Sequence, residues 1–253
     1  MSSEGKALTF GSLFAGIGGF DLGFERAGMQ CKWQVEIDPF CRKVLAKHWP
    51  NVRRHDDVRT FPPDGDWSVD VICGGFPCQD MSNAGNRVGI YGERSGLWSE
   101  FARIVRQLRP RFVVVENVEA LAIRGLDRVL GDLADLGFDA EWQSIPASAV
   151  GHLHERRRLW VCAYMQEAGS EVCLFGEGDD WGSPLELRRL ASLVTATQWW
   201  RCGQRPEGLP DVLRMAHGIP NGVDRIGACG NAVVPQVAEW IGRRITLTAK
   251  AQP

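Results

Sequence analysis

One cysteine, one glutamate and two arginines have types and positions suited to acting together in one reaction. Cys78 follows Pro77 in the stretch GGFPCQDMSNAG, directly after the apolar run VDVICGG. Glu116 lies near the end of another apolar run, RFVVVENV, and Arg156 and Arg158 open a third, HERRRLW. Strand side chains two residues apart share a face, so both arginines can point into one site. If these runs are strands that meet at one rim, a thiol, a carboxylic acid and two guanidinium groups gather there, a combination suited to nucleophilic attack with acid assistance.

The sequence around Cys78 leaves four roles to weigh: nucleophile, metal ligand, half of a disulfide, or bystander thiol. The chain has eight cysteines but no CxxC pair, so the usual zinc spacing is absent and we expect no metal. The N-terminus lacks the features of a secretory signal, which favours a reducing compartment over disulfides. Cys73 and Cys162 lie inside apolar runs, where a thiol behaves as a small hydrophobic group. The polar, glycine-rich stretch after Cys78 is typical of a functional loop or of disorder.

A second group of residues predicts a cofactor site. The stretch FAGIGG follows the first predicted strand, where glycines allow a tight turn and the close approach of a ligand. Glu36 ends the second strand, the position at which acidic residues hold ribose hydroxyls in dinucleotide sites. Asp57 follows the next strand end, where a carboxylate can accept a hydrogen bond from an adenine amino group. A plain turn, a helix cap or a solvated loop end explains each feature singly, but the three together favour an adenosine ligand. Because the GxGxxG fingerprint is absent, we expect a cofactor without phosphates.

Alternating strand-like and helix-like segments would position these residues. Helical patterns in GIGGFDLGFERAG, DPFCRKVLAKHW, SEFARIVRQLRP and LDRVLGDLADLG separate apolar, β-branched strands. This alternation predicts an α/β fold, a mostly parallel sheet with helices on both faces. Ligands of such sheets bind beyond the carboxyl ends of the strands, which is where the residues above would meet.

The pattern changes after residue 165. Residues 1–165 form the predicted catalytic and cofactor-binding domain, and residues 166–225 a small irregular region rich in Gly, Pro, Arg and aromatic side chains. Residues 226–253 regain helical spacing and are expected to return to the first domain. The net charge of −2 neither favours nor excludes nucleic acid, because a neutral protein can carry a basic groove. No apolar stretch is long enough to span a bilayer, so we expect a cytoplasmic protein with no membrane partner.

With these stretches in place, the chain resembles the C5-cytosine DNA methyltransferase family. The matching stretches are, in the family's order, FAGIGGFDLGF, VEID, DDVRTF, GGFPCQDMSNAG, RSGLW, ENV, HERRRLW and GNAVVPQ. The stretch HGIPNGVDRIGACGNAVVP is similar to versions carried by bacterial phages and prophages. The resemblance implies a Rossmann-like S-adenosylmethionine-dependent methyltransferase fold with a small target-recognition region. It also implies S-adenosylmethionine as methyl donor, double-stranded DNA as substrate, and a monomer.

The resemblance assigns roles to the catalytic residues. Cys78 matches the thiolate that adds to cytosine C6 and makes C5 nucleophilic enough to take a methyl group. Glu116 matches the carboxyl group that assists protonation of N3. Arg158 matches the arginine that binds the base carbonyl, and Arg156 the one that supports the loop cysteine. The target base is out of reach inside a duplex and must be flipped into the pocket. No residue is an obvious base for the C5 proton, and water can serve.

The same resemblance implies the cofactor and DNA residues. The implied cofactor-binding residues are Phe14, Ala15, Gly16, Gly18, Gly19, Glu36, Ile37, Asp57, Val58, Pro77, Leu97, Asn231, Ala232 and Val233. The glycine turn would face the methionine half of the cofactor, Glu36 the ribose, and Asp57 with Val58 the adenine edge. Gln79, Arg87 and Arg94, in the loop after Cys78, are expected to contact DNA.

Two features depart from the family pattern. His154 stands where the family usually has a glutamine before the two arginines, and we expect activity to survive this change. The short recognition region predicts a short target site or help from a partner.

Two other functions stay open. One is a tRNA cytosine methyltransferase, although the Cys-Phe-Thr string that marks that branch is absent. The other is a catalytically silent DNA-binding regulator, although every matched catalytic position is filled.

Overall fold

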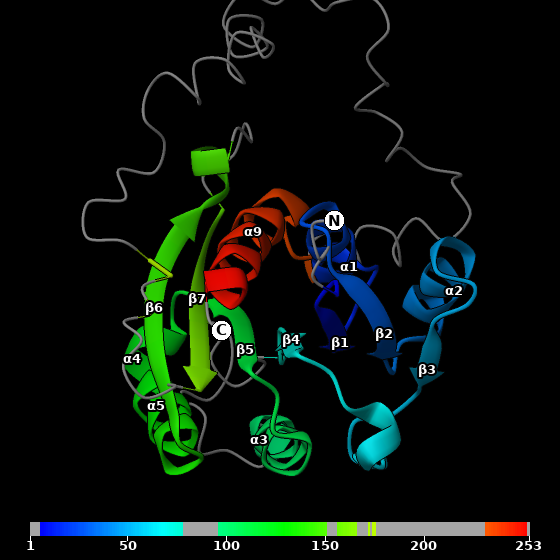
Figure 1. Cartoon of the computed structure of the whole chain (residues 1–253), viewed down its shortest axis with the longest axis horizontal. Coiled ribbons are helices and arrows are strands. Elements are labelled where there is room, and N and C mark those ends of the chain that lie inside the picture. Colours follow the sequence, from blue (N-terminus) through cyan, green and yellow to red (C-terminus); the bar gives the residue numbers. More distant parts are fainter. Residues whose placement is uncertain are drawn as a thin grey trace, which may run out of the picture.

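The fold is built around one mixed β-sheet (Figure 1). A computed structural model describes residues 6–77, 96–150, 156–165, 172, 174–175 and 231–251. Within these residues the sheet has seven strands in the order β3-β2-β1-β4-β5-β7-β6. The strands are β1 (Thr9–Leu13), β2 (Gln30–Val35), β3 (Arg53–His55), β4 (Val71–Gly74), β5 (Phe112–Val118), β6 (Phe138–Pro146) and β7 (Arg157–Met165). The α-helices are α1 (Gly19–Arg26), α2 (Pro39–His48), α3 (Gly96–Leu108), α4 (Leu121–Arg124), α5 (Leu126–Asp135) and α9 (Pro235–Ala251), and the short 3₁₀ helices are η1 (Gly65–Trp67) and η5 (Ala147–Val150).

The strand directions place the carboxyl ends of five parallel strands at the same end of the sheet. Strands β3, β2, β1, β4 and β5 run parallel, whereas β7 is antiparallel to both β5 and β6. The strand order reverses between β1 and β4, because β2 and β3 lie on one side of β1 and the later strands on the other. Such a switch point leaves a crevice at the carboxyl ends of the strands, where ligands of α/β sheets bind.

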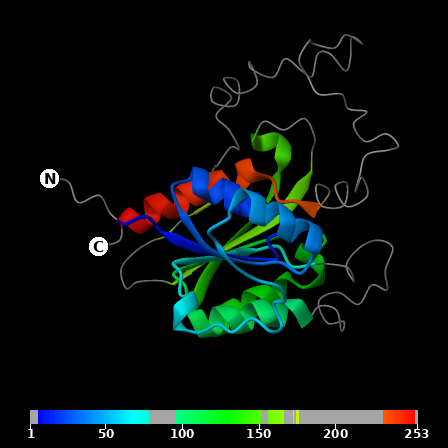
Figure 2. The ribbon, with the colours of Figure 1, turned by 90° about the vertical axis from the view of Figure 1, so that its right-hand side faces the viewer.

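Helices cover both faces of the sheet (Figure 1, Figure 2). One core lies under α1 and α9 and includes Phe20, Phe24, Trp160 and Ile241. The other lies under α3 and α5 and includes Trp98, Phe101, Val129 and Leu133. The predicted mostly parallel α/β fold with helices on both faces is therefore confirmed.

The last helix returns to the first one. Contacts between α1 and α9 are extensive, and two glycines of α1 make them possible. A Cβ atom on Gly19 would lie 2.4 Å from the carbonyl oxygen of Val233, and one on Gly23 equally close to that of Pro235. Real side chains do not tolerate such distances, so glycine at these positions lets the C-terminal segment pack against the start of α1. Within the described residues, no helix is long and apolar enough to cross a membrane.

Candidate active site

The first candidate cluster forms where β5 and β7 lie side by side. Because β7 runs antiparallel to β5, its first residues lie at the carboxyl end of β5, and Arg158 pairs with Val118 in the ladder. Glu116 precedes Val118 by two residues and shares its face of the sheet. The Arg158 Nε atom lies 3.1 Å from Glu116 Oε1. Arg156, just before β7, acts electrostatically on the same carboxyl group. The structure thus brings together three of the four predicted catalytic residues, whose roles stay predictions.

Glu116 is a buried acid with an unusual pKa. Its side chain is 9% exposed, against 24% for Arg158. Burial raises the pKa of Glu116 from 4.5 to about 7, while the charges of Arg158 and Arg156 act in the opposite direction. Loss of hydration therefore outweighs attraction to the arginines. A carboxyl group with this pKa can give and take a proton near neutral pH, as a general acid must.

The segment after β4 approaches this carboxyl group. A Cβ atom on Gly75 would lie 2.8 Å from Glu116 Oε2, so the absent side chain makes room for the acid. Asn117 is buried beside Glu116, and its Nδ2 atom donates a hydrogen bond to the carbonyl oxygen of Phe76 at 3.1 Å. Both contacts hold the end of β4 against the end of β5. Sequence reasoning did not single out Asn117, because its partner lies in the segment after β4, far away in the sequence.

The second candidate cluster lines a cavity of about 630 Å³ at the carboxyl edge of the sheet. This volume is in the usual range for a small-molecule site. Half of the predicted cofactor residues contribute to the lining, namely Phe14, Glu36, Ile37, Asp57, Val58, Pro77 and Leu97. The rest of the lining comes from Val35, Arg59, Gly96, Ser99 and Glu100. Phe14 has φ of 53°, a left-handed conformation that is uncommon for a bulky residue and that turns the chain after β1.

Glu36 joins two backbone segments at the cavity. Its Oε2 atom accepts a hydrogen bond from the backbone N–H of Gly16, and its Oε1 atom one from that of Asp38, both at 2.7 Å. The carboxylate therefore ties the glycine turn to the start of α2. Each oxygen has a second lone pair, so the group can still accept hydrogen bonds from a ligand.

Asp57 is held by a neighbour that sequence reasoning did not assign. The Arg59 Nε atom lies 2.9 Å and 3.0 Å from the two carboxylate oxygens, and its Nη2 atom lies 2.6 Å from Oδ2. The backbone N–H of Arg59 also donates to Asp57 Oδ1. These bonds lower the pKa of Asp57, chiefly through the guanidinium, and keep the carboxylate ionised. Its predicted contact with an adenine amino group would therefore be made by a carboxylate whose orientation is already fixed.

The remaining predicted cofactor residues lie outside the cavity lining. Gly16 donates to Glu36 and Gly19 packs on Val233, so the glycine turn and the C-terminal segment touch each other. The predicted cofactor residues that do not line the cavity are Ala15, Gly16, Gly18, Gly19, Asn231, Ala232 and Val233.

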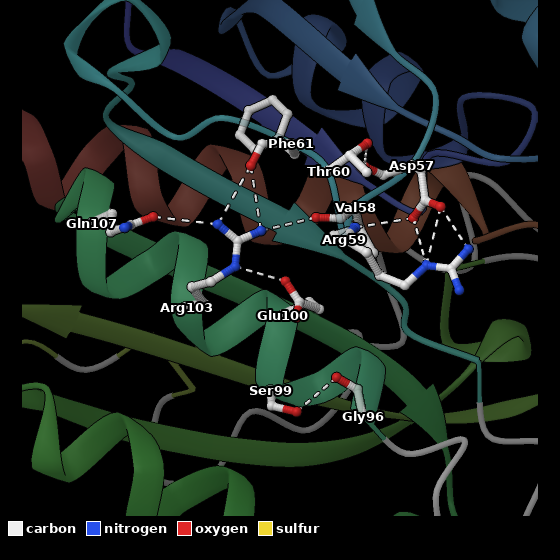
Figure 3. Close-up of polar contacts among 10 residues, drawn as sticks. All are labelled: Asp57, Val58, Arg59, Thr60, Phe61, Gly96, Ser99, Glu100, Arg103 and Gln107. Carbon is white, nitrogen blue, oxygen red and sulfur yellow. Dashed lines mark hydrogen bonds and ion pairs between the residues drawn. The ribbon is translucent and has the colours of Figure 1, made fainter.

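Behind the cavity, α3 is bonded to the loop that follows β3 (Figure 3). Arg103 donates to Glu100 Oε2 at 2.6 Å and to the backbone carbonyl oxygen of Val58 at 3.0 Å. It also reaches the carbonyl oxygen of Phe61 and the side chain of Gln107. The spacing of Glu100 and Arg103 is that of a helix surface pair and could have been recognised, but the carbonyl partners depend on tertiary packing.

Several predictions fall outside the described residues. These are the positions of Cys78, Gln79, Arg87, Arg94 and His154 and nearly all of the recognition region 166–225.

The comparisons with known proteins place the chain in a class and then in a family. Its fold is that of Rossmann-like S-adenosylmethionine-dependent methyltransferases. A DNA modification methyltransferase encoded within an Escherichia coli prophage has a TM-score of 0.64 at 18% identity, over 96% of this chain and 100% of that one. DNMT2 of Spodoptera frugiperda has a TM-score of 0.56 at 20% identity, over 69% of this chain and 54% of that one. The family model of C-5 cytosine-specific DNA methylases matches residues 8–185, and the chain belongs to this family.

The curated relatives are type II methyltransferases. M.Eco47II of Escherichia coli is 40% identical over 192 residues, which is 73% of this chain and 44% of the relative. M.DsaV of Dactylococcopsis salina is 30% identical over 190 residues, 73% of this chain and 52% of the relative. M2.BsuMI of Bacillus subtilis strain 168 is 32% identical over 172 residues, 64% of this chain and 43% of the relative. The chain thus spans about half the length of the curated relatives it matches.

Proposed function

We propose that the protein is a DNA (cytosine-5-)-methyltransferase that transfers a methyl group from S-adenosylmethionine to C5 of a cytosine flipped out of duplex DNA. The observation that carries the proposal is the buried Glu116 carboxyl group, paired with Arg158 at the sheet edge that also holds the cavity. The pKa of this carboxyl group is near neutral pH, and guanidinium groups lie beside it. Such a group is suited to giving a proton to the cytosine ring and taking it back during the reaction. Family membership and the names of the type II relatives support the same reaction.

The proposed chemistry begins at Cys78. Its thiolate attacks C6 of cytosine, and the electron pair of the C5–C6 double bond moves onto C5 while Glu116 gives a proton to N3. When bound, S-adenosylmethionine would supply the methyl group to C5, with the S–CH3 bond broken, its electron pair kept by sulfur and S-adenosylhomocysteine as the leaving group. A base, for which bulk water is sufficient, then removes the C5 proton, the double bond re-forms, the thiolate leaves and the N3 proton returns to Glu116. Arg158 binds the base carbonyl, and Arg156 supports the cysteine.

The residues of the cavity fit this cofactor. Phe14, Ile37 and Leu97 offer apolar surface for an adenine ring. Glu36 has free lone pairs for ribose hydroxyls, and Asp57 is an ionised acceptor for the exocyclic amino group. The lining contains three carboxylates, including Glu100, against the single guanidinium of Arg59. Because Asp57 is paired with Arg59 and Glu100 with Arg103, the described lining residues offer no guanidinium without a carboxylate partner to bind a phosphate, which favours a methyl donor without phosphates.

Residues 166–225 are proposed as the target-recognition region, with residues 1–165 and 226–253 forming the catalytic part. We propose that Gln79, Arg87 and Arg94 contact the DNA, and that the protein acts in the cytoplasm of a bacterium as a monomer. A role in restriction–modification follows from the printed names of the type II relatives. The short recognition region favours a short target sequence.

Methyl transfer from labelled S-adenosylmethionine to duplex DNA, to tRNA and to no acceptor tests the proposal. We expect label in DNA alone. Label in tRNA alone would make the protein an RNA methyltransferase, and no transfer to either would leave a silent DNA-binding protein. Cys78→Ser should abolish transfer, whereas Cys41→Ser, a buried thiol of α2, should leave it unchanged. Wild-type activity in Cys78→Ser would remove the covalent mechanism.

The ribose role of Glu36 has its own test. Glu36→Gln should raise the KM for S-adenosylmethionine and recover near wild-type kcat at saturating cofactor. An activity loss that excess cofactor does not restore would argue against this role.

A further inference from the structure

Arg103 joins two parts of the cavity wall through one side chain (Figure 3). Its Nη2 atom donates to the carbonyl oxygen of Val58, and both terminal nitrogens reach that of Phe61 at 3.3 to 3.4 Å. Its Nε atom donates to Glu100 Oε2, and its Nη1 atom to Gln107. Val58 and Glu100 line the cavity, one from the loop after β3 and the other from α3. The guanidinium therefore fixes two walls of the cavity relative to each other.

The loop after β3 is anchored separately by its aromatic side. The Phe61 ring lies 5.0 Å from that of Trp33 and 4.6 Å from that of Trp67, measured between ring centroids, and all three rings are buried. Arg103 also bonds the carbonyl oxygen of Phe61, but this apolar contact would still hold the far end of the loop if those bonds were lost. The near end, which carries Asp57 and Val58, is the part that the arginine restrains. Removal of Arg103 should thus leave the fold intact and release only the cavity side of the loop.

No other natural side chain can make this set of bonds. Arginine presents five N–H donors in a planar fork, so one group can bond two carbonyl oxygens and a carboxylate at once. Lysine has a single nitrogen and can keep the Glu100 contact without spanning both carbonyls. The Arg103 and Glu100 side chains are 31% and 28% exposed, so the bonds are partly shielded from water.

We propose that Arg103 is a positioning residue for the adenosine half of the cofactor, acting through Val58 and Glu100 to hold the adenine-facing wall in its binding geometry. The inference rests on the proposed function, because it requires that the cavity bind S-adenosylmethionine. It goes beyond that function by assigning cofactor affinity to a residue behind the cavity. When the cavity wall is already ordered, less conformational entropy is lost as the ligand binds. Loss of this order should therefore weaken cofactor affinity rather than slow the chemical step.

Calorimetric titration with S-adenosylhomocysteine and with 5′-methylthioadenosine tests the inference without any need for turnover. Arg103→Ala should weaken the binding of both ligands about tenfold, and Arg103→Lys about threefold, fold-changes of the size that one charge-assisted hydrogen bond supplies. Equal losses for both ligands would place the effect at the adenosine half. Arg106→Ala, an exposed arginine of the same helix, is the matched control and should bind within about twofold of wild type, a ratio that is small on the free-energy scale. In turnover assays Arg103→Ala should raise the KM for the methyl donor and leave kcat within about threefold of wild type.

The outcomes separate the inference from the function on which it rests. Wild-type protein that binds neither ligand would reject the proposed cofactor. Wild-type protein that binds both, together with an Arg103→Ala variant that binds them equally well, would overturn the positioning role alone. A fall in kcat at unchanged KM, or a loss confined to S-adenosylhomocysteine, would also overturn it. If Arg103→Ala does not fold, Arg103→Lys decides, because unchanged affinity in a folded lysine variant contradicts the need for a fork.

Discussion

Replacing Glu116 with glutamine should change how the stability of the protein depends on pH. Burial raises the pKa of this carboxyl group in the folded state from its ordinary 4.5 to about 7. In the unfolded chain the group loses its proton near 4.5, whereas the folded chain keeps it until about pH 7. Between these values the folded state holds more protons than the unfolded state, so raising the pH removes stability. The contribution is fully present below about pH 4.5 and is lost as the pH rises through 7.

The magnitude follows from the two pKa values. Their difference, 7 minus 4.5, is 2.5. At about 1.4 kcal/mol per pH unit this corresponds to roughly 3 kcal/mol of unfolding free energy. Glutamine has nearly the same shape and does not titrate, so it removes this dependence with little change in packing. Part of this change falls below pH 5, so relative to wild type Glu116→Gln should gain about 2.5 kcal/mol between pH 5 and pH 8.

Urea unfolding of both proteins at pH 5, 6, 7 and 8 measures this difference, because other titrating groups are common to both and cancel. A difference that is flat with pH would mean that Glu116 has an ordinary pKa. A fall in the stability of Glu116→Gln relative to wild type as the pH rises would mean that the Arg158 ion pair outweighs burial. That result would refute the reasoning. The same pKa predicts that wild-type kcat declines above pH 7 as Glu116 loses its proton, if the acid role proposed for it holds.

Three further substitutions test local features of the fold by urea unfolding. Gly19→Ala should lower the unfolding free energy by about 1–3 kcal/mol, because the new methyl group would overlap the carbonyl oxygen of Val233; an unchanged midpoint would mean that the C-terminal segment does not pack there. Asp21→Asn keeps the acceptor of the Gln34 hydrogen bond, and because burial raises the pKa of Asp21 above its ordinary 3.8, the stability of the variant relative to wild type should increase as the pH rises above that value; a decrease would show that Asp21 is stabilised as a charge. Asp38→Ala removes the carboxylate that caps α2 and should cost about 1 kcal/mol; no loss would mean that the cap contributes nothing.

The sequence was sufficient to predict most of the elements but not the direction of the last strand. The apolar run RLWVCAYM predicts a buried strand, and such a run is compatible with either direction. Its position at the rim depends on direction, because only an antiparallel β7 brings Arg158 beside Glu116. A signal was present in the connection, since residues 147–156 offer no room for the long helix that parallel neighbours need.

The polar partners were the least predictable part of the site. Asp21 lies in a helix whose pattern, GFDLGF, places polar residues toward water, yet the side chain is fully buried and accepts from Gln34 at 2.8 Å. The reason is that Asp21 faces the sheet, where Gln34 and Cys31 of β2 donate to its Oδ1 atom. Arg59 and Arg103 were missed for a related reason, because their partners are set by the loop after β3. The spacing of motifs predicts which residues line a site. The hydrogen bonds and ion pairs that fix those residues depend on how the elements and loops pack.

One short segment explains how the two candidate clusters could serve a single reaction. Gly75 lies against the Glu116 carboxylate, and Pro77, two residues later, lines the cavity. Because three residues of chain extend at most about 10 Å, the carboxyl group and the edge of the cavity must be close neighbours. The next residue in the chain is Cys78. In the sequence Cys78 is thus one residue from the cavity lining and three from Gly75, which supports the proposal that one base could meet both the acid and the methyl donor. This arrangement depends on the parallel pairing of β4 with β5, which aligns Gly74 with Val115 and so sets Gly75 beside Glu116.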